Sequence, residues 1–430
     1  MPSPSQGLSG SGSSGSGSPG SSGSGSSGSG SSELKDAARQ TVDDSLAELV
    51  ALSHAIHDHP ETSFEEDQAC AWTSEALSAA GFHLTSGVAG MPTAFSAEYG
   101  SGPLVVAVCA EYDALPGVGH ACGHNIIAAS AVGAGLGLAS LADQLGITVR
   151  VLGTPAEEGG GGKVTMLDAG VFDDVHAAMM IHPWPQDRLA GTCLAVSHFD
   201  VTFTGKSAHA SAAPWEGINA GDAMTLSQVA LGLLRQQFRP GDQVHGIVTD
   251  GGEAANIIPS SVRGRFMCRS TTLAGLELLE PRVMACFEAG ALATGATFSV
   301  QSLAPVYSHM ESDLGLLAEY RVNAEALGRT FELDDADAPR PTFSTDMANV
   351  SLQVPTIHPL VGIDAAGSVN HQPEFAAACI TPSADTAVRD GAVSMAWTVI
   401  DAAQPGPLRE RLLAGVGDRV GDRSPAGPTG

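Results

Sequence analysis

This chain contains a series of largely apolar segments separated by segments with helical character. Leu104–Ala110 is a continuous apolar run, and Ile147–Leu152, Ala177–Ile181 and the weaker Thr356–Val361 resemble it. Strands that are apolar along their whole length are buried on both faces, as in parallel sheets covered by helices. The sequence therefore predicts an α/β fold with a mixed, mostly parallel sheet and helices on both faces.

A second pattern interrupts the first one between residues 196 and 305. The expected order is strand, helix, strand, strand, helix, strand, with strands at 198–204, 244–249, 261–269 and 297–303 and helices at 217–235 and 273–294. This order is typical of a small ferredoxin-like α+β domain. We expect residues 33–195 and 306–405 to form one domain, into which residues 196–305 are inserted.

Both ends of the chain have a composition that disfavours packing. Residues 7–32 are almost entirely Gly and Ser, and the C-terminal end is rich in Gly and Pro. Such segments bury little apolar surface. We expect a disordered tail or linker at residues 1–32 and a flexible tail at residues 406–430.

Charge and cysteine content narrow the possible partners and location. The formal net charge of −27 repels phosphate backbones and anionic lipid, which argues against nucleic acid and membrane partners. The seven cysteines are odd in number and scattered, and no basic segment followed by an apolar one marks a signal peptide. These features predict a cytoplasmic protein.

Polar residues that can bind metal follow the predicted strands. Cys122 and His124 lie in Gly119–Asn125, where Gly123 permits the sharp turn that lets both reach one metal ion. Glu157 and Glu158 follow an apolar strand, and neighbouring extended residues point in opposite directions. One carboxylate can then bind metal while the other acts as a general base. The alternatives are a buried cysteine beside a core histidine, and a solvated acidic turn.

The ordered set of motifs resembles the M20 metallopeptidase family, and most closely its amidohydrolase branch, which includes aminobenzoyl-glutamate hydrolases and M20-type dipeptidases. The motifs are, in order, Asp113–Pro116, His120–His124, Glu157–Glu158, His182 and His371. By themselves, His182 and His371 are ordinary core or loop histidines. The resemblance covers residues 35–402, and the order of the motifs makes it specific.

The resemblance implies a site with two divalent metal ions, Zn or Mn, in each chain. Cys122 matches a ligand shared by both metals, and Glu157 matches the general base. Asp113 matches a carboxylate that orients a ligand. The remaining metal ligands would be His124, Glu158, His182 and His371. Glu111 stands where other branches carry a histidine ligand, so its role stays open, as does that of Asp346.

The inserted segment resembles the family's lid and dimerisation domain. His209 matches a histidine that polarises the scissile carbonyl, often across a dimer interface, and Asn256 and Arg269 match residues that contact the substrate carboxylate. Without the resemblance, Arg269 is an ordinary surface arginine. The alternative for His209 is that it only caps a turn in the loop of residues 205–209. The resemblance implies a homodimer formed through this domain.

The predicted function is metal-dependent hydrolysis of a small amide, namely an N-acyl amino acid, an aroyl-glutamate or a dipeptide. A metal-activated water would attack, with Glu157 as the general base. An M20-fold dipeptidase of narrow specificity is a closely related alternative. Two rivals are a cysteine hydrolase with Cys122 as nucleophile, which leaves Glu157 and Glu158 without a role, and a non-catalytic binding protein on the same fold.

Overall fold

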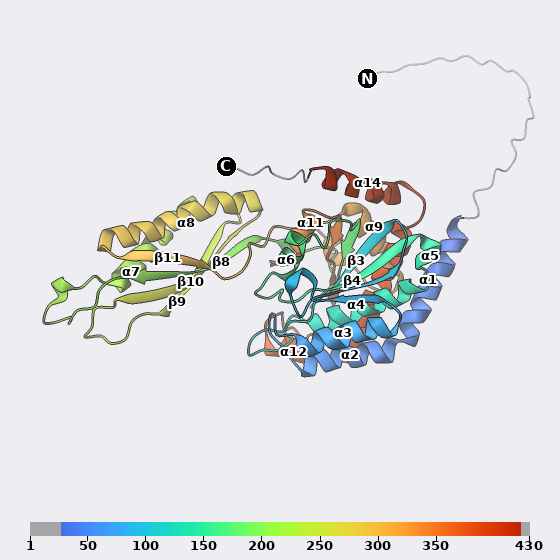
Figure 1. The fold of residues 1–430 in the computed structure, drawn as a ribbon, viewed down its shortest axis with the longest axis horizontal. Helices are drawn as coiled ribbons and strands as arrows, with labels where there is room; N and C mark the ends of the chain where they lie inside the picture. The colour runs from blue at the N-terminus through green and yellow to red at the C-terminus, as the bar shows by residue number, and fades with distance from the viewer. Residues whose placement is uncertain (1–26, 423–430) are drawn as a thin grey trace, which may run out of the picture.

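The computed structural model describes residues 27–422, which form two lobes (Figure 1). The larger lobe is built on a six-stranded sheet in the order β1-β2-β4-β3-β5-β13. Strands β3, β4, β5 and β13 are parallel, whereas β1 and β2 add an antiparallel edge. The mixed, mostly parallel sheet is thus confirmed. The strands are β1 (His83–Ser86), β2 (Phe95–Gly100), β3 (Leu104–Ala110), β4 (Ile147–Gly153), β5 (Ala177–Met179) and β13 (Thr356–Ile357).

Alternate side chains of the central strands enter two different hydrophobic clusters. Val106 and Val108 of β3 pack in the cluster that contains α4, whereas Ala107 and Cys109 pack on the other face with Met166 of α6. Burial on both faces explains why β3 is apolar throughout. The helices of the first face are α1 (Ser27–Asp44), α2 (Leu46–Asp58), α3 (Asp67–Ala79), α4 (His124–Ala139), α9 (Leu314–Ala326) and α13 (Pro382–Ala402), and those of the second are α6 (Gly162–Asp168) and α11 (Met347–Ser351).

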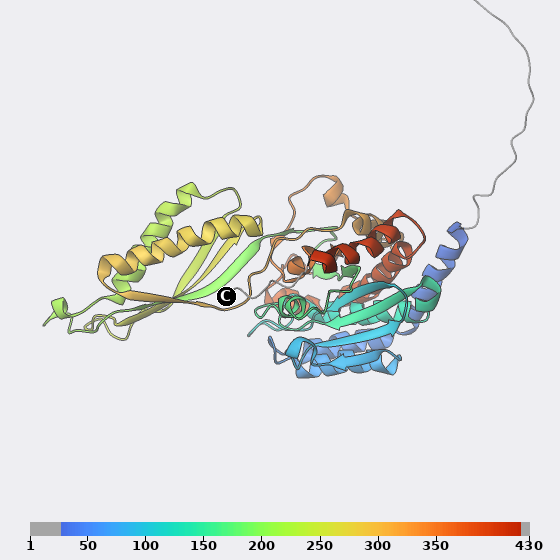
Figure 2. The same ribbon diagram turned by 45° about the horizontal axis from the view of Figure 1, so that its top comes forward.

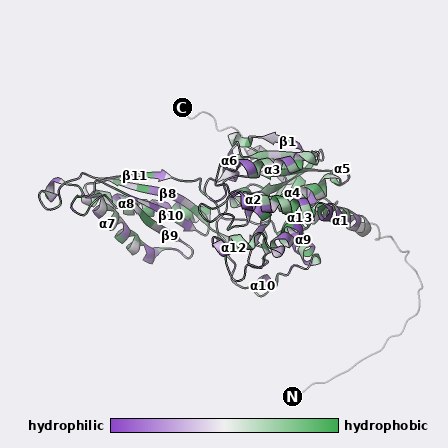
Figure 3. Cartoon of the chain, turned by 90° about the horizontal axis from the view of Figure 1, so that it is seen from below, coloured by the Kyte–Doolittle hydropathy of each residue, from purple (hydrophilic) through white to green (hydrophobic). Residues whose placement is uncertain are grey.

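Helix α4 lies at the centre of the larger lobe and carries the start of the predicted metal site. Apolar residues predominate along it (green in Figure 3), and nearly all of its residues are buried. Glycines allow its neighbours to approach closely, since a Cβ on Gly133 would lie 2.7 Å from that of Ala392 in α13. Close packing on every side fixes the N-terminal end of α4.

The smaller lobe is a four-stranded antiparallel sheet in the order β11-β8-β10-β9. Its two helices cover one face of the sheet (Figure 2) and share with it a core that contains Phe199, Phe266 and Phe287. The order of elements agrees with the ferredoxin-like prediction. The elements are β8 (Ala195–Thr204), α7 (Ala220–Leu234), β9 (Gln243–Asp250), β10 (Ser261–Ser270), α8 (Leu273–Thr294) and β11 (Thr297–Ser302).

Short elements complete the larger lobe. They include α5 (Ala142–Leu145), β6 (His182–Trp184), β7 (Thr192–Cys193), α10 (Glu332–Asp335), β12 (Thr342–Phe343), β14 (Leu360–Gly362) and α12 (Pro373–Ala378). Strand β6 pairs with β14, and β7 pairs with β12. In the described part of the chain, no helix is both long and apolar enough to cross a membrane.

Parts of the two expected tails are helical in the structure. Residues 407–422, expected to be flexible, form helix α14 (Pro407–Asp422), and residues 27–32 belong to α1. Leu412 is buried against the larger lobe, and Arg409 donates hydrogen bonds to the carbonyls of Leu145 and Gly146. These contacts offset the weak helix propensity of the glycines within α14. Residues 1–26 and 423–430 of the expected tails lie outside the described residues.

Candidate metal centre

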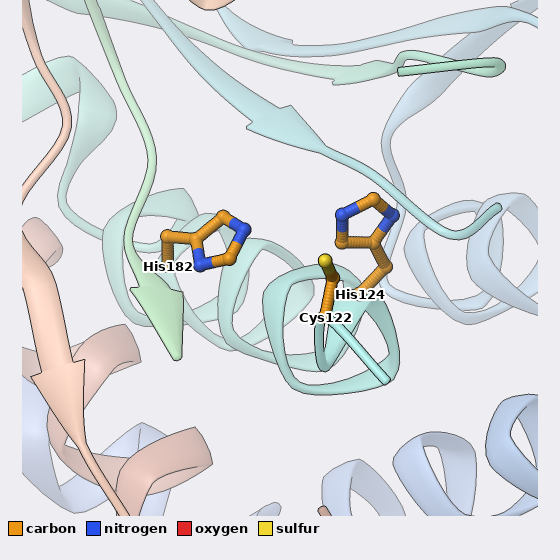
Figure 4. Close-up of side chains that lie close together, drawn as sticks. All are labelled: Cys122, His124 and His182. Carbon is orange, nitrogen blue, oxygen red and sulfur yellow. The ribbon is translucent and has the colours of Figure 1, made fainter. Parts of the chain in front are cut away.

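The predicted metal ligands meet at the carboxyl edge of the parallel strands. Cys122 lies two residues before His124, the first residue of α4, and His182 reaches toward them from β6 (Figure 4). Gly123 between them has a φ of +78°, and a Cβ there would lie 2.8 Å from Pro183. Only glycine fits this turn without strain, so the turn holds Cys122 and His124 on one site.

Two groups of ligand atoms share Cys122. One consists of Cys122, His124 and His182, and the other consists of Cys122, Glu158 and His371. Within each group the ligand atoms lie within 4.8 Å of one another. His124 Nε2 and Glu158 Oε1 are buried without a hydrogen-bond partner among the described residues. Buried polar atoms without partners are costly, so the residues fit two cations that share one thiolate.

Asp113 connects the two ligand groups. One of its oxygens lies 3.0 Å from His124 Nδ1, and the other accepts a hydrogen bond of 2.9 Å from the main-chain N–H of Glu158. Burial opposes the ionised form, but the contact with His124 outweighs it and lowers the pKa of Asp113. The bond to Nδ1 leaves Nε2 of His124 directed at the cluster, as expected for a carboxylate that orients a metal ligand.

Glu157 is almost completely buried and lines the cavity beside the two ligand groups. Burial, and then the negative charges of Glu111 and Glu158, raise the pKa of Glu157 well above its ordinary value. The preceding Ala156 has a φ of +60°, which is uncommon for a residue other than glycine, asparagine or aspartate. This backbone turn places Glu157 and Glu158 on the same site.

A buried ion cluster that the sequence does not predict lies behind Glu157. Lys163 Nζ is 2.6 Å from Glu111 Oε1 and 2.7 Å from Asp346 Oδ1, and all three side chains are fully buried. The second oxygen of Glu111 lies 3.6 Å from His124 Nε2. The sequence leaves the roles of Glu111 and Asp346 open. In the structure, both carboxylates pair with the buried ammonium group of Lys163. In the sequence, Lys163 follows a run of glycines that lacks the full pattern of a phosphate-binding loop. Nothing in this pattern indicates a buried ion cluster.

A cavity of about 630 Å³ opens from the metal ligands toward the smaller lobe. The sheet of the smaller lobe contributes Arg269 to the lining of this cavity. It also contributes three side chains that lie side by side on adjacent strands, namely Met267, His198 and His245. Arg269 donates a hydrogen bond of 2.9 Å to Ser344 Oγ and has no ion pair among the described residues. The lining also includes the rings of Trp184 and Phe343, which lie 5.8 Å apart. The cavity therefore combines the positive charge of Arg269 with apolar surface.

His209 and Asn256 do not reach this cavity within one chain. Both side chains are exposed on the smaller lobe and lie together, since Ala210, the residue after His209, donates its main-chain N–H to the carbonyl of Asn256. His209 Nδ1 accepts hydrogen bonds from the main-chain N–H groups of Ser211 and Ala212. These bonds are those of a turn cap, so the chain by itself gives His209 no contact with the metal ligands.

Comparison with known proteins identifies the family. Residues 107–389 match the family described as peptidase family M20/M25/M40. The chain is 38% identical over 399 residues to Xaa-Arg dipeptidase of Mus musculus, covering 89% of this chain and 91% of that protein. It is 34% identical over 267 residues to a p-aminobenzoyl-glutamate hydrolase polypeptide of Escherichia coli, covering 57% and 56% of the two chains.

Solved structures with the same fold are more distant in sequence. An aminobenzoyl-glutamate utilization protein from Klebsiella pneumoniae superposes with a TM-score of 0.67 at 19% identity, covering 86% of this chain and 99% of that one. A dinuclear metal-binding M20 peptidase from Bacillus subtilis gives 0.62 at 21% identity, covering 84% and 99%. These likenesses concern the fold alone. The family match and the similarity to Xaa-Arg dipeptidase show that the chain belongs to peptidase family M20/M25/M40 and is a hydrolase of amide or peptide bonds.

Proposed function

We propose that the chain hydrolyses small N-acyl amino acids, aroyl-glutamates or dipeptides with two divalent metal ions, Zn or Mn, and Glu157 as the general base. The observation that carries the proposal is the pair of ligand groups that share Cys122 beside the buried carboxyl of Glu157. Cys122 would contact both ions, His124 and His182 would hold one, and Glu158 and His371 the other. When bound, such ions lower the pKa of water and polarise a carbonyl. The name of the Bacillus subtilis peptidase supports a dinuclear site.

Glu157 would move the proton between water and the leaving nitrogen. Its carboxylate takes a proton from the attacking water and then returns it to the departing amine. Burial raises the pKa of Glu157, whereas bound cations would lower it, and the two opposing effects suit a group that accepts a proton and then returns it. Asp113 would keep His124 and the Glu158 main chain in place during the reaction.

Arg269 would bind a terminal carboxylate of the substrate. Its guanidinium faces the cavity and contacts only a hydroxyl and a thioether among the described side chains, so its positive charge is not balanced there. A guanidinium forms two parallel hydrogen bonds with a carboxylate. The names of the relatives fit this role, because both a Xaa-Arg dipeptide and an aminobenzoyl-glutamate carry a terminal carboxylate.

The exposed positions of His209 and Asn256 favour a homodimer in which these residues enter the partner's cavity. The smaller lobe exposes apolar side chains on α7 and on the edge strand β9, including Val229, Leu233 and Ile247. An unpaired edge strand beside apolar surface is a suitable interface. In such a dimer, the smaller lobe would serve as a lid, and His209 of one subunit would stabilise the oxyanion in the other.

A cysteine hydrolase fits the geometry less well. Burial and then the charge of Glu158 raise the pKa of the Cys122 thiol well above its ordinary value. A nucleophilic cysteine needs the opposite shift. Thiolate formation at Cys122 instead calls for a cation, as at a metal site.

The test is metal analysis combined with a panel of small amides. We expect close to two divalent ions per chain and turnover of at least one N-acyl amino acid, aroyl-glutamate or dipeptide. Chelation should abolish turnover, and thiol alkylation should not affect the metal-loaded enzyme. Full activity in chelator with no metal bound would refute the proposal. Metal binding without turnover of any panel member would favour a non-catalytic protein.

A further inference from the structure

The segment that carries Glu157 and Glu158 is held by residues far from it in the sequence. Ala156, in its unusual backbone conformation, donates its N–H to Glu66 Oε1 at 2.9 Å, and Lys163 donates its N–H to Asp346 Oδ2 at 2.9 Å. Between these two bonds, the main-chain carbonyl of Glu157 itself accepts a hydrogen bond of 2.6 Å from Tyr307 Oη. An uncommon backbone conformation persists only where its surroundings fix it, so these bonds determine where Glu157 lies.

Tyr307 also lies at the point where the smaller lobe joins the larger one. Its main chain pairs with that of Val196 through N–H···O=C bonds of 2.9 and 3.0 Å in the two directions. Val196 is in the first strand of the insert, β8, and Tyr307 follows its last strand, β11. The two segments that connect the lobes are therefore bonded to each other at Tyr307.

The side chain of Tyr307 packs tightly between these elements. It is 3% exposed, and its ring lies 6.1 Å from that of His198 on the cavity face of the insert. The ring also lies against Gly161, which has a φ of +66° and where a Cβ would lie 3.1 Å from the ring. Burial, and then the charges of Asp346 and Glu157, raise the pKa of Tyr307, so its hydroxyl stays a hydrogen-bond donor.

We propose that Tyr307 is a positioning residue that couples the connection between the lobes to the general base. Its hydroxyl fixes the main chain of Glu157, and its own main chain is fixed to Val196, so the orientation of the insert and the position of the base are set together. This inference rests on the proposed role of Glu157. Because a displacement of about 1 Å can lower a rate about 100-fold, one hydrogen bond at this place can affect turnover strongly.

The test replaces only the hydroxyl, with Tyr307→Phe, which keeps the ring and both bonds to Val196. We expect kcat to fall at least about 10-fold, by the same sensitivity of rate to position, with KM within about twofold and two metal ions retained. Hydrogen exchange of the peptide covering residues 154–163 should accelerate. The control is Tyr320→Phe, at another buried tyrosine that lies in α9 outside the cavity, and it should leave both readouts unchanged.

Unchanged kcat and unchanged exchange in Tyr307→Phe would overturn the inference. If this variant does not fold, Val196→Gly provides the second test, because it loosens the connection without touching the base segment. Coupling predicts faster exchange at residues 154–163 in that variant, and unchanged exchange there would contradict it. The underlying proposal is tested separately: full turnover by Glu157→Gln would remove Glu157 as the base, whereas an inactive Glu157→Gln beside a fully active Tyr307→Phe would reject only the role of Tyr307.

Discussion

Replacement of Lys163 by Met should destabilise the larger lobe far more than the loss of a surface ion pair. Lys163 is fully buried and lies within 2.7 Å of oxygens of both Glu111 and Asp346, which are also fully buried. Methionine fills a similar volume but leaves two carboxylates without their cation. Breaking a buried pair in this way costs about 3–5 kcal/mol.

A matched control is Arg411→Met. Arg411 makes two bonds of 2.7 and 2.8 Å to Asp313, but its side chain is 49% exposed. A pair of this kind contributes only about 0–1 kcal/mol. The two variants therefore compare similar ion-pair distances at different burial, and the double variant Lys163→Met with Asp346→Asn should recover part of the loss, because one of the two unpaired carboxylates is gone.

The assay is urea unfolding in chelator, which separates folding from metal binding. Three of the four tryptophans lie in the larger lobe, Trp72 in α3, Trp184 in β6 and Trp397 in α13, so their fluorescence follows its transition. If Lys163→Met lowered the free energy of unfolding by less than about 1 kcal/mol, as expected for a surface pair, the account of Lys163 as a buried counter-charge would be wrong.

Three further predictions concern the base, the proposed dimer and the pH dependence of stability. Glu157→Gln should lower kcat by about 10²–10⁴-fold with two metal ions retained, whereas Glu158→Gln should bind fewer ions; near-normal turnover of the first variant would refute its role. Inactive His209→Ala and Glu157→Gln subunits, mixed under proven exchange, should regain activity toward half of the wild-type value per mixed dimer, and no recovery would exclude action across the interface. Burial, and then the negative charge of Asp113, raise the pKa of Glu66 from 4.5 to about 7. The protonated form of Glu66 therefore contributes to the free energy of unfolding below pH 4.5, and this contribution is lost as the pH rises through 7. Glu66→Gln should therefore stabilise the metal-free protein by up to about 3 kcal/mol at pH 8 and hardly at pH 4, as measured by urea unfolding at both pH values; an equal effect at both would contradict the reasoning.

The strands and the insert could be predicted because their patterns are local. Leu104–Ala110 is β3 with the predicted bounds, since a strand buried on both faces is marked by its own apolar residues. The meeting of Cys122, Glu158 and His182 follows from the rule that sites form at the carboxyl ends of parallel strands. The helix at 407–422 could not be predicted in this way, because its burial depends on contacts with residues such as Leu145, far away in the sequence.

The supporting residues of the site lack a local pattern as well. Lys163 and Asp346 are 183 positions apart, and Tyr307 and Glu157 are 150 apart, so no local spacing relates them. An isolated lysine or tyrosine is usually exposed or part of a core, and only the folded chain shows what it binds. The fold of one chain leaves the side chain of His209 exposed, and only the proposed dimer would bring it to a metal site.

Anomalous X-ray diffraction from crystals of the metal-loaded enzyme would show whether two metal ions share Cys122. We predict two anomalous peaks per chain, both beside Cys122 Sγ, one next to His124 and His182 and the other next to Glu158 and His371. A single peak, or peaks away from Cys122 in an enzyme that turns over its substrate, would contradict the account.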